Sequence, residues 1–398
     1  MSEILPAAAV RTPVRAIALL AAAAFVSTAT VRVADPLLPM VAREFAVSPA
    51  AASVIATSAA LAYGLFQIFY GSLGDRFGKI TVIAVATGLS ALSTAAAALA
   101  DNLALLGLLR FISGGTAAAV VPLAIAHIGD VVPYQSRQAM LARFLSGQIL
   151  GVLFGQAAGD IFADYLGWRG IFLVLGALYL VIDALLWLEL GAGRVIDSRV
   201  PNARFRGLPA RYLAMLRVTR VRSILAVASA EGFLFFGGLT YLGAFAHYEF
   251  ALSFTFVGLI LGCFGLGGLI YSLTVKFFVG GLGERRMAML GGSLLALGFG
   301  GVASAGVWWL LPPAVVVCGV GFYMHHNTLQ TNATQMAPDA RGLAIALFAF
   351  VFFLSQATGV ALCGVVIEIA GYRPMFALVG ALLLPLALAF ASTLPRRG

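Results

Sequence analysis

Long apolar stretches alternate with short polar segments along the whole chain. Each apolar stretch is continuous, without the alternation of polar and apolar residues expected of a strand with one buried face. Such a stretch predicts a helix that crosses a bilayer, because a helix satisfies its own backbone groups where water is absent. Twelve such stretches have the approximate bounds 14–38, 50–71, 80–100, 103–127, 140–163, 170–191, 222–246, 253–277, 287–305, 308–335, 342–368 and 374–394.

The connections are short except for one basic segment, residues 192–221, which contains seven arginines and two prolines. We expect it to be a cytoplasmic linker between two six-helix bundles, residues 1–191 and 222–398. The halves repeat: GWRGIF at 167–172 matches GYRPMF at 371–376, an offset of 204 residues that Gly155 and Gly359 share. This constant offset indicates a duplicated six-helix unit.

Composition supports an all-α integral membrane protein. Of the 398 residues, 61% are hydrophobic and 10% charged, and the mean hydropathy of +1.00 leaves too little polar surface for a water-facing globule. The net charge of +9 comes mostly from Lys and Arg between alternate spans. That pattern predicts a bacterial-type inner membrane with both termini cytoplasmic, rather than a nucleic-acid partner.

One segment, GSLGDRFGKI at residues 71–80, places Asp75, Arg76 and Lys79 within five positions of this weakly charged chain. Its glycines are Gly71, Gly74 and Gly78. Glycines permit a tight turn and close helix approach, and a helix N-terminus favours a nearby carboxylate. We expect a turn whose charges lock two helix ends in one state of a moving protein.

This segment resembles the signature loop of the major facilitator superfamily, G-x-L-(A/G)-D-R-x-G-(R/K), at every defined position. The resemblance covers the whole chain and implies two pseudo-symmetric bundles around a central cavity. It also implies that Asp75 is a conformational latch that stabilises the outward-open state. A generic basic turn would explain Arg76 and Lys79 but neither Asp75 nor the glycines.

Two further segments resemble motifs of the same superfamily. The fourth span, LLRFISGGTAAA at 108–119, implies a role in proton handling for Arg110. The fifth span has a close-packing face of Gly147, Gly151, Gly155 and Gly159. Drug–proton antiporters have G-x-x-x-G-P-x-x-G-G there, whereas Gln156 and Asp160 replace the proline and the last glycine in this chain. That departure weakens the antiport assignment.

In the superfamily the first, fourth, seventh and tenth spans line the cavity, and most ionisable residues within the spans of this chain gather there. They are Arg32, Asp35, Arg110, His127, Glu231, His325 and His326. A charge inside a membrane helix is costly, so it faces a cavity or a partner. Asp183 in the sixth span has no explanation from the sequence.

Asp35 and Arg110 lie at similar depth, and we expect them to interact directly or through water. Asp35 would then exchange a proton as substrate binds and leaves. Alternatively, Asp35 precedes Pro36 and ends the first helix in the headgroup region.

Glu231 is a second candidate for proton coupling, with a structural carboxyl as the alternative. His325 and His326 are candidates for the cavity wall, or else satisfied core residues. Neighbouring helix residues point about 100° apart, so we expect the two rings not to share a ligand. Further cavity candidates are Arg32, Asn327, Gln67, Gln356 and Tyr63. No metal site is expected, because no companion cluster has suitable spacing.

The sequence therefore predicts a proton-coupled secondary transporter that resembles drug and metabolite exporters of the superfamily and works by alternating access as a monomer. It needs no cofactor beyond the proton gradient, and its partners are protons, lipid and a small-molecule substrate. One alternative is an uncoupled facilitator or importer of a small organic anion. A second is a membrane sensor without transport. An enzyme is not expected, since no phosphate loop, nucleophile elbow or metal pair occurs in a suitable context.

Overall fold

The computed structural model describes residues 14–132, 134–192, 208–337 and 341–394, which form helices and no strand. Eleven helical segments in this part of the chain are long and apolar enough to cross a membrane. The remaining expected span, 140–163, is helical within α8. The protein is therefore the all-α membrane protein that the apolar pattern predicts.

The N-terminal half comprises α1 (Val14–Arg32), α2 (Ala34–Glu44), α3 (Pro49–Ala52), α4 (Val54–Phe77), α5 (Lys79–Ala97), α6 (Leu103–Ala117), α7 (Val120–Val131) and α8 (Tyr134–Gly191). A short helix, α9 (Leu208–Leu216), follows. The C-terminal half comprises α10 (Thr219–Glu231), a π-helical turn (Gly232–Phe236), α11 (Gly237–Leu239), α12 (Leu242–Phe250), α13 (Phe254–Ser304), a 3-10 turn (Trp308–Leu310), α14 (Leu311–Gln335), α15 (Arg341–Ala370) and α16 (Tyr372–Thr393).

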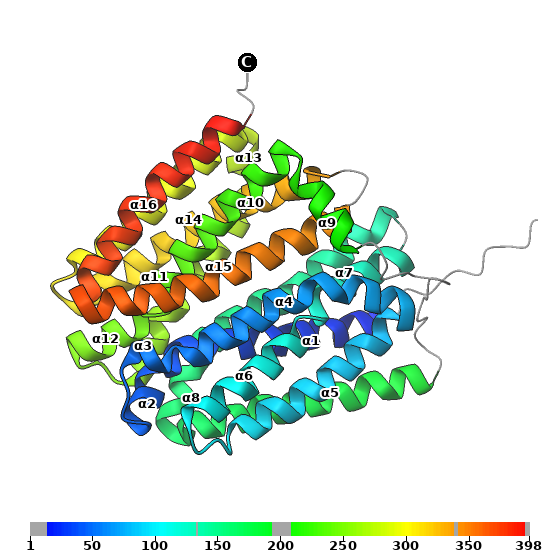
Figure 1. Cartoon of the computed structure of the whole chain (residues 1–398), viewed down its shortest axis with the longest axis horizontal. Coiled ribbons are helices and arrows are strands. Elements are labelled where there is room, and N and C mark those ends of the chain that lie inside the picture. The colour runs from blue at the N-terminus through cyan, green and yellow to red at the C-terminus, as the bar shows by residue number, and fades with distance from the viewer. Residues whose placement is uncertain (1–13, 133, 193–207, 338–340, 395–398) are drawn as a thin grey trace, which may run out of the picture.

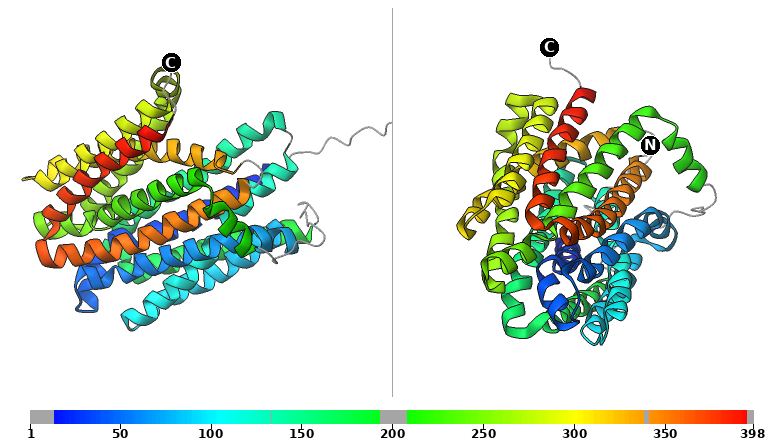
Figure 2. Two further views of the ribbon diagram at one scale, coloured as in Figure 1. Left: turned by 45° about the horizontal axis from the view of Figure 1, so that its top comes forward. Right: turned by 60° about the vertical axis from the view of Figure 1, so that its left-hand side comes forward.

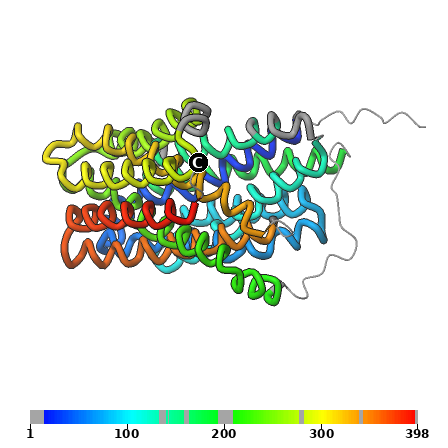
Figure 3. Tube along the Cα trace, turned by 90° about the horizontal axis from the view of Figure 1, so that it is seen from above, coloured from blue at the N-terminus to red at the C-terminus, as the bar shows by residue number. Residues whose placement is uncertain are grey.

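The long helices run roughly parallel to one axis, with α2, α3 and α12 at one end and α9 at the other (Figure 1). We name these the far end and the linker end. The helices of the two halves form two groups side by side (Figure 2). Seen from above, the helices run along the long axis of the molecule (Figure 3). Helix α4 packs on α15, and α8 packs on α13, so the boundary between the halves runs through the middle of the molecule.

The repeat in the sequence is also present in the glycine turns of the backbone. Gly78 and Gly283 make turns with φ of +96° and +72°, and Gly167 and Gly371 make turns with φ of +66° and +87°. Only glycine adopts such angles without strain, so these four positions let consecutive helices reverse direction within one residue. The pairs are separated by 205 and 204 residues, which extends the repeat seen in the sequence to the turns themselves.

The first span is longer than the sequence suggests. Helix α1 breaks briefly at Val33, and α2 then continues to Glu44 with Asp35 in its first turn and Pro39 inside. Asp35 is 3% exposed. The alternative that Asp35 ends the first helix in the headgroup region is therefore wrong, because Pro36 falls in the first turn of α2, where a missing N–H is tolerated.

Candidate functional site

Two contacts between the halves meet near the middle of the molecule. The hydroxyl of Thr240, between α11 and α12, donates a hydrogen bond to Oδ1 of Asp35 at 3.0 Å. The Arg32 guanidinium lies 3.9 Å from the centre of the Phe236 ring. Asp35 and Arg32 belong to the first span and their partners to the seventh, so both contacts depend on how the halves sit together.

Arg110 lies close enough to act on Asp35 electrostatically, although Arg32 has the larger effect. Its Nε donates to the carbonyl of Ile55 at 3.0 Å, while Nη1 and Nη2 are buried without a hydrogen-bond partner among the described residues. Asp35 and Arg110 make no direct hydrogen bond or ion pair, and the interaction through water that was the other expectation stays a prediction. The carbonyl of Ile55 instead accepts a hydrogen bond from Arg110, and the hydroxyl of Thr240 donates one to Asp35.

Glu231 and both histidines of α14 form one cluster. Each Glu231 oxygen lies 2.7 Å from the Nδ1 atom of a different ring, Oε1 from His325 and Oε2 from His326. The two rings thus share one protein side chain, and the expectation that they would not share a ligand stays a prediction. A carboxylate has two oxygens, and Glu231 lies between the two diverging rings so that each ring reaches one of them.

The two rings have different surroundings. The His325 side chain is 2% exposed, whereas that of His326 is 14% exposed and stacks on Phe322 with centroids 4.9 Å apart. Phe352 lies 4.8 Å from the His326 ring on another side. His326 is thus the more exposed histidine of the cluster.

Not all of the other predicted cavity residues contact the Asp35 group or the Glu231 cluster. Tyr63 of α4 packs against Phe353 of α15, with centroids 4.5 Å apart, and so adds a third contact between the halves. Gln67 and Gln356 are buried, and Oε1 of Gln356 has no hydrogen-bond partner in the described part of the chain. Asn327 is half-buried, and its carbonyl accepts a hydrogen bond from Thr331.

In the loop between α4 and α5, Lys79 is the central charge. Its Nζ lies 2.7 Å from Asp130 of α7 and 3.4 Å from Asp75. Lys79 thus ties the second and third spans to the end of the fourth, and Asp75 contributes through it. An added Cβ at Gly74 would lie 2.5 Å from Leu123, but nothing lies within 4 Å of one at Gly71. Close helix approach therefore explains Gly74 and does not explain Gly71.

The glycine face of the fifth span packs on the first span. A Cβ added at Gly147, Gly151 or Gly155 would lie within 2.7 Å of the carbonyl oxygen of Ala21, Phe25 or Ala29, respectively. Gly359 meets the carbonyl of Phe233 in the same way, 204 residues later. Gly159 lies outside the residues whose side chains the structure describes.

At the far end, one arginine in each half joins a glutamate to a backbone carbonyl. Arg169 and Trp168 donate to the Glu44 carboxylate, and Arg169 also donates to the carbonyl of Ala100. Partial burial opposes ionisation of Glu44, but the hydrogen bonds from Arg169 and Trp168 outweigh it and lower the pKa of this carboxyl. In the second half, Arg373 joins Glu249 to the carbonyl of Ala303.

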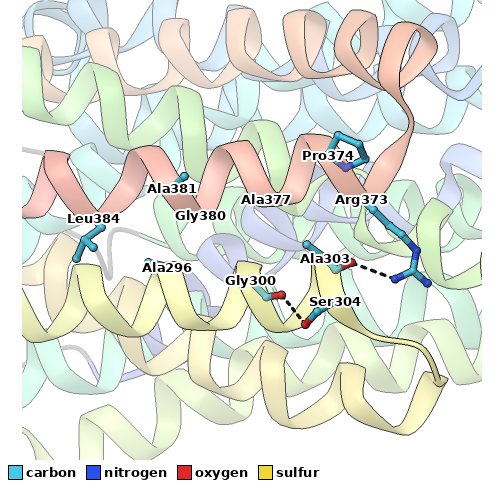
Figure 4. A pocket seen from close by; sticks show the side chains of 10 residues that line it. All are labelled: Ala296, Gly300, Ala303, Ser304, Arg373, Pro374, Ala377, Gly380, Ala381 and Leu384. Carbon is cyan, nitrogen blue, oxygen red and sulfur yellow. Dashed lines mark hydrogen bonds between the residues drawn. The ribbon is translucent and has the colours of Figure 1, made fainter.

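A pocket of about 560 Å³ opens between the second part of α13 and α16 (Figure 4). Small and apolar residues line most of it, and its charged residue, Arg373, already pairs with Glu249. Asp183 packs against Gly88, with its Oδ1 lacking a hydrogen-bond partner among the described residues. Neither feature connects to the contacts between the halves.

Sequence reasoning missed Thr240 and Asp130 as members of these sites. Thr240 is uncharged and stands inside an apolar stretch, where no sequence signal separates it from packing residues. Asp130 could have been found, since it ends the fourth span opposite the charged loop. Within the described residues, no group of three His, Cys, Asp or Glu side chains has the arrangement of a metal site.

Comparison with known proteins identifies the family of this chain. The family model described as Major Facilitator Superfamily matches residues 20–359 and 243–398. The uncharacterised MFS-type transporter YwfA of Bacillus subtilis is 26% identical over 358 residues, 85% of this chain and 82% of that protein. The inner membrane transport protein YnfM of Escherichia coli is 24% identical over 374 residues, 91% of this chain and 86% of the relative.

Solved structures share the fold. The nucleoside transporter NupG superimposes with a TM-score of 0.76 at 15% identity, covering 94% of this chain and 99% of the other. The human organic anion transporter MFSD10 superimposes with a TM-score of 0.72 at 17% identity, covering 95% and 99%. These relatives and neighbours are membrane transporters rather than enzymes.

Proposed function

The chain belongs to the major facilitator superfamily, and on that premise we propose that it is a proton-coupled transporter that exports small organic molecules. The relatives support membrane transport in general. Proton coupling and the direction of transport are the steps that we add.

The observation that carries the proposal is the hydrogen bond between Asp35 and Thr240. The other oxygen of Asp35 is buried without a hydrogen-bond partner among the described residues. A charge at such depth costs about 2.5–3.5 kcal/mol on insertion scales. Because Thr240 belongs to the other half, separation of the halves at this level removes a partner of the carboxylate. Proton binding at Asp35 and the position of the halves are therefore linked.

Export follows from the same linkage if protons enter as substrate leaves. Protonation of Asp35 would leave Arg32 and Arg110 without their nearby anion, which changes the charge of the central region between the two states. The Lys79 bridge to Asp75 and Asp130 would stabilise the state in which these helix ends lie together.

An uncoupled facilitator or importer of a small organic anion is the second candidate. Two arginines and one aspartate meet at the centre, which favours an anion. Gln156 replaces the proline that antiporters have in the fifth span. A flux that does not depend on pH would support this candidate over the first.

The test is proton movement in energised inverted membrane vesicles that contain the protein. Pooled compounds are added: lipophilic cations, amphenicols, sugars, amino acids and organic anions. We expect one pool to release protons through the wild type and not through Asp35→Asn. Asp101→Asn is the matched control, because Asp101 is exposed at the far end. Proton release that persists in Asp35→Asn would remove Asp35 from the coupling mechanism.

Thr240 gives a second pair of variants. Thr240→Val removes the hydroxyl that Asp35 accepts from, whereas Thr240→Ser keeps it. We expect the valine variant to lose at least tenfold in coupled transport and the serine variant to stay near wild type. Equal activity of the two variants would show that this hydrogen bond does not contribute.

A further inference from the structure

We propose that the substrate is a small organic anion with a planar aromatic ring, bound by Arg32 and Phe236 together. The inference rests on the proposed transport function and names the substrate class that it leaves open. The guanidinium of Arg32 would bind the anionic group, and the rings next to it would bind the aromatic part. Because Arg32 and Phe236 belong to different halves, such a ligand would contact both.

The guanidinium N–H groups of Arg32 have no acceptor among the described residues. Arg32 is 8% exposed, and its guanidinium makes no hydrogen bond or ion pair within the described part of the chain. The Phe236 ring covers one face of the guanidinium, which leaves the N–H groups along its edge available. An Arg at this depth needs an acceptor for those groups, and the planar fork fits a carboxylate or sulfonate best.

Phe236 packs in a group of aromatic rings. Phe322 lies 5.5 Å from the Phe236 ring centre, and Phe352 lies 5.8 Å from it. The rings of Tyr63 and Tyr323 also lie near the Arg32 side chain. Flat aromatic walls favour a flat aromatic ligand, because offset and edge-to-face ring contacts add to the burial of apolar area.

The charges around the position argue against a cationic ligand. Asp35 faces both Arg32 and Arg110 and already accepts a hydrogen bond from Thr240. Both oxygens of Glu231 are occupied by His325 and His326. Oδ2 of Asp35 has no hydrogen-bond partner, but Arg32 and Arg110 both lie near this carboxylate and leave the group with a net positive charge that disfavours a cation. The Nη atoms of Arg110 also lack acceptors among the described residues.

Binding to the purified protein, without a gradient, tests this inference separately from transport. The probes are 2-naphthoate, its neutral amide, the naphthylmethylammonium cation and the saturated decalin carboxylate, each titrated calorimetrically. We expect 2-naphthoate to bind at least tenfold more tightly than each of the other three. Removing the charge or the ring lowers affinity by a similar factor, because a charge-assisted hydrogen bond or an aromatic contact is lost.

The variants are Arg32→Gln and Phe236→Leu, with Arg222→Gln and Phe256→Leu as controls at exposed positions of the C-terminal half. We expect both central variants to weaken naphthoate binding at least tenfold and both controls to leave it unchanged. Preferred binding of the cation, naphthoate binding that survives Arg32→Gln, or no binding of any aromatic carboxylate or sulfonate would overturn the inference. Binding as expected without proton movement in vesicles would instead overturn proton coupling and leave this inference standing.

Discussion

Glu231 shows how one buried residue is made compatible with an apolar helix. The carboxylate is fully enclosed, yet each of its oxygens has an imidazole Nδ1 at 2.7 Å. Leaving a buried polar group unpaired costs about 1–3 kcal/mol. The three side chains therefore depend on one another, and a change in any of them affects the hydrogen bonds of the others.

We predict that Glu231→Gln and His325→Leu are strongly non-additive. Each single variant leaves a buried partner unmatched, so each should lower the melting temperature of the purified protein. The double variant should lower it little further than the worse single variant. Glu231→Gln combined with His247→Leu is the control, since His247 bonds the carbonyl of Leu252 elsewhere. Additive effects in the first pair would contradict a shared cluster.

Glu44 permits a prediction about pH. Its pKa in the folded protein lies below the ordinary value of 4.5, because Arg169 and Trp168 stabilise the carboxylate. A lowered pKa stabilises the fold above the ordinary value, and that contribution is lost as the pH falls through the folded value. The pair is partly exposed, so the contribution is roughly 0.2–1 kcal/mol. Glu44→Gln should melt below the wild type at pH 7, and the difference should shrink as the pH falls below 4.5 towards the lowered pKa of Glu44.

At the scale of elements, the glycine face of the fifth span decides how closely two helices approach. The backbone of the first span occupies the space where side chains would stand at Gly147, Gly151 and Gly155. In a membrane, where lipid competes equally for apolar surface, such backbone contact is a main source of helix association. Gly359 has the equivalent role between the eleventh and seventh spans.

We predict that Gly151→Ala destabilises the protein and that Gly71→Ala does not. The new methyl group at position 151 would lie 2.3 Å from the carbonyl oxygen of Phe25, so the two helices must move apart. Overpacking of this kind typically costs about 1–3 kcal/mol. At position 71 the space is open. Melting temperatures of the two purified variants provide the measurement, and equal values would contradict the packing argument.

At the scale of the whole molecule, contacts between described side chains join the halves from the centre to the far end. They are Asp35 with Thr240, Ser48 with Glu368, and Asp164 with Thr255. Alternating access requires such contacts to break when the far end opens. A covalent link across the halves should therefore stop transport, while one within a half should not.

This prediction can be tested with cysteine pairs in a background without Cys263, Cys318 and Cys363. The pair Ser48→Cys with Glu368→Cys spans the halves, and Glu44→Cys with Arg169→Cys lies within one half. A short bismaleimide should abolish transport in the first pair and leave the second active. Continued transport by the fully cross-linked first pair would show that the far end does not open there.

Much of the fold was predictable, because apolar runs of bilayer length have few alternatives. The twelve spans, the turn at Gly78 and the repeated arginines at 169 and 373 all follow from local sequence. In the candidate site, Asp35, Arg110 and Glu231 stand out against an apolar background, and Tyr63 was also a candidate. Thr240 instead resembles an ordinary helix residue until the seventh span is placed beside the first.

The sequence by itself determined that this is a membrane transporter of the superfamily, since hydropathy and the signature loop are local properties. Tertiary structure alone decided the partners: Thr240 rather than Arg110 for Asp35, and both histidines for Glu231. The physical reason is that a buried polar group takes the partner that packing brings within about 3 Å. That distance depends on the rotation and spacing of helices far apart in the chain, which no local pattern encodes.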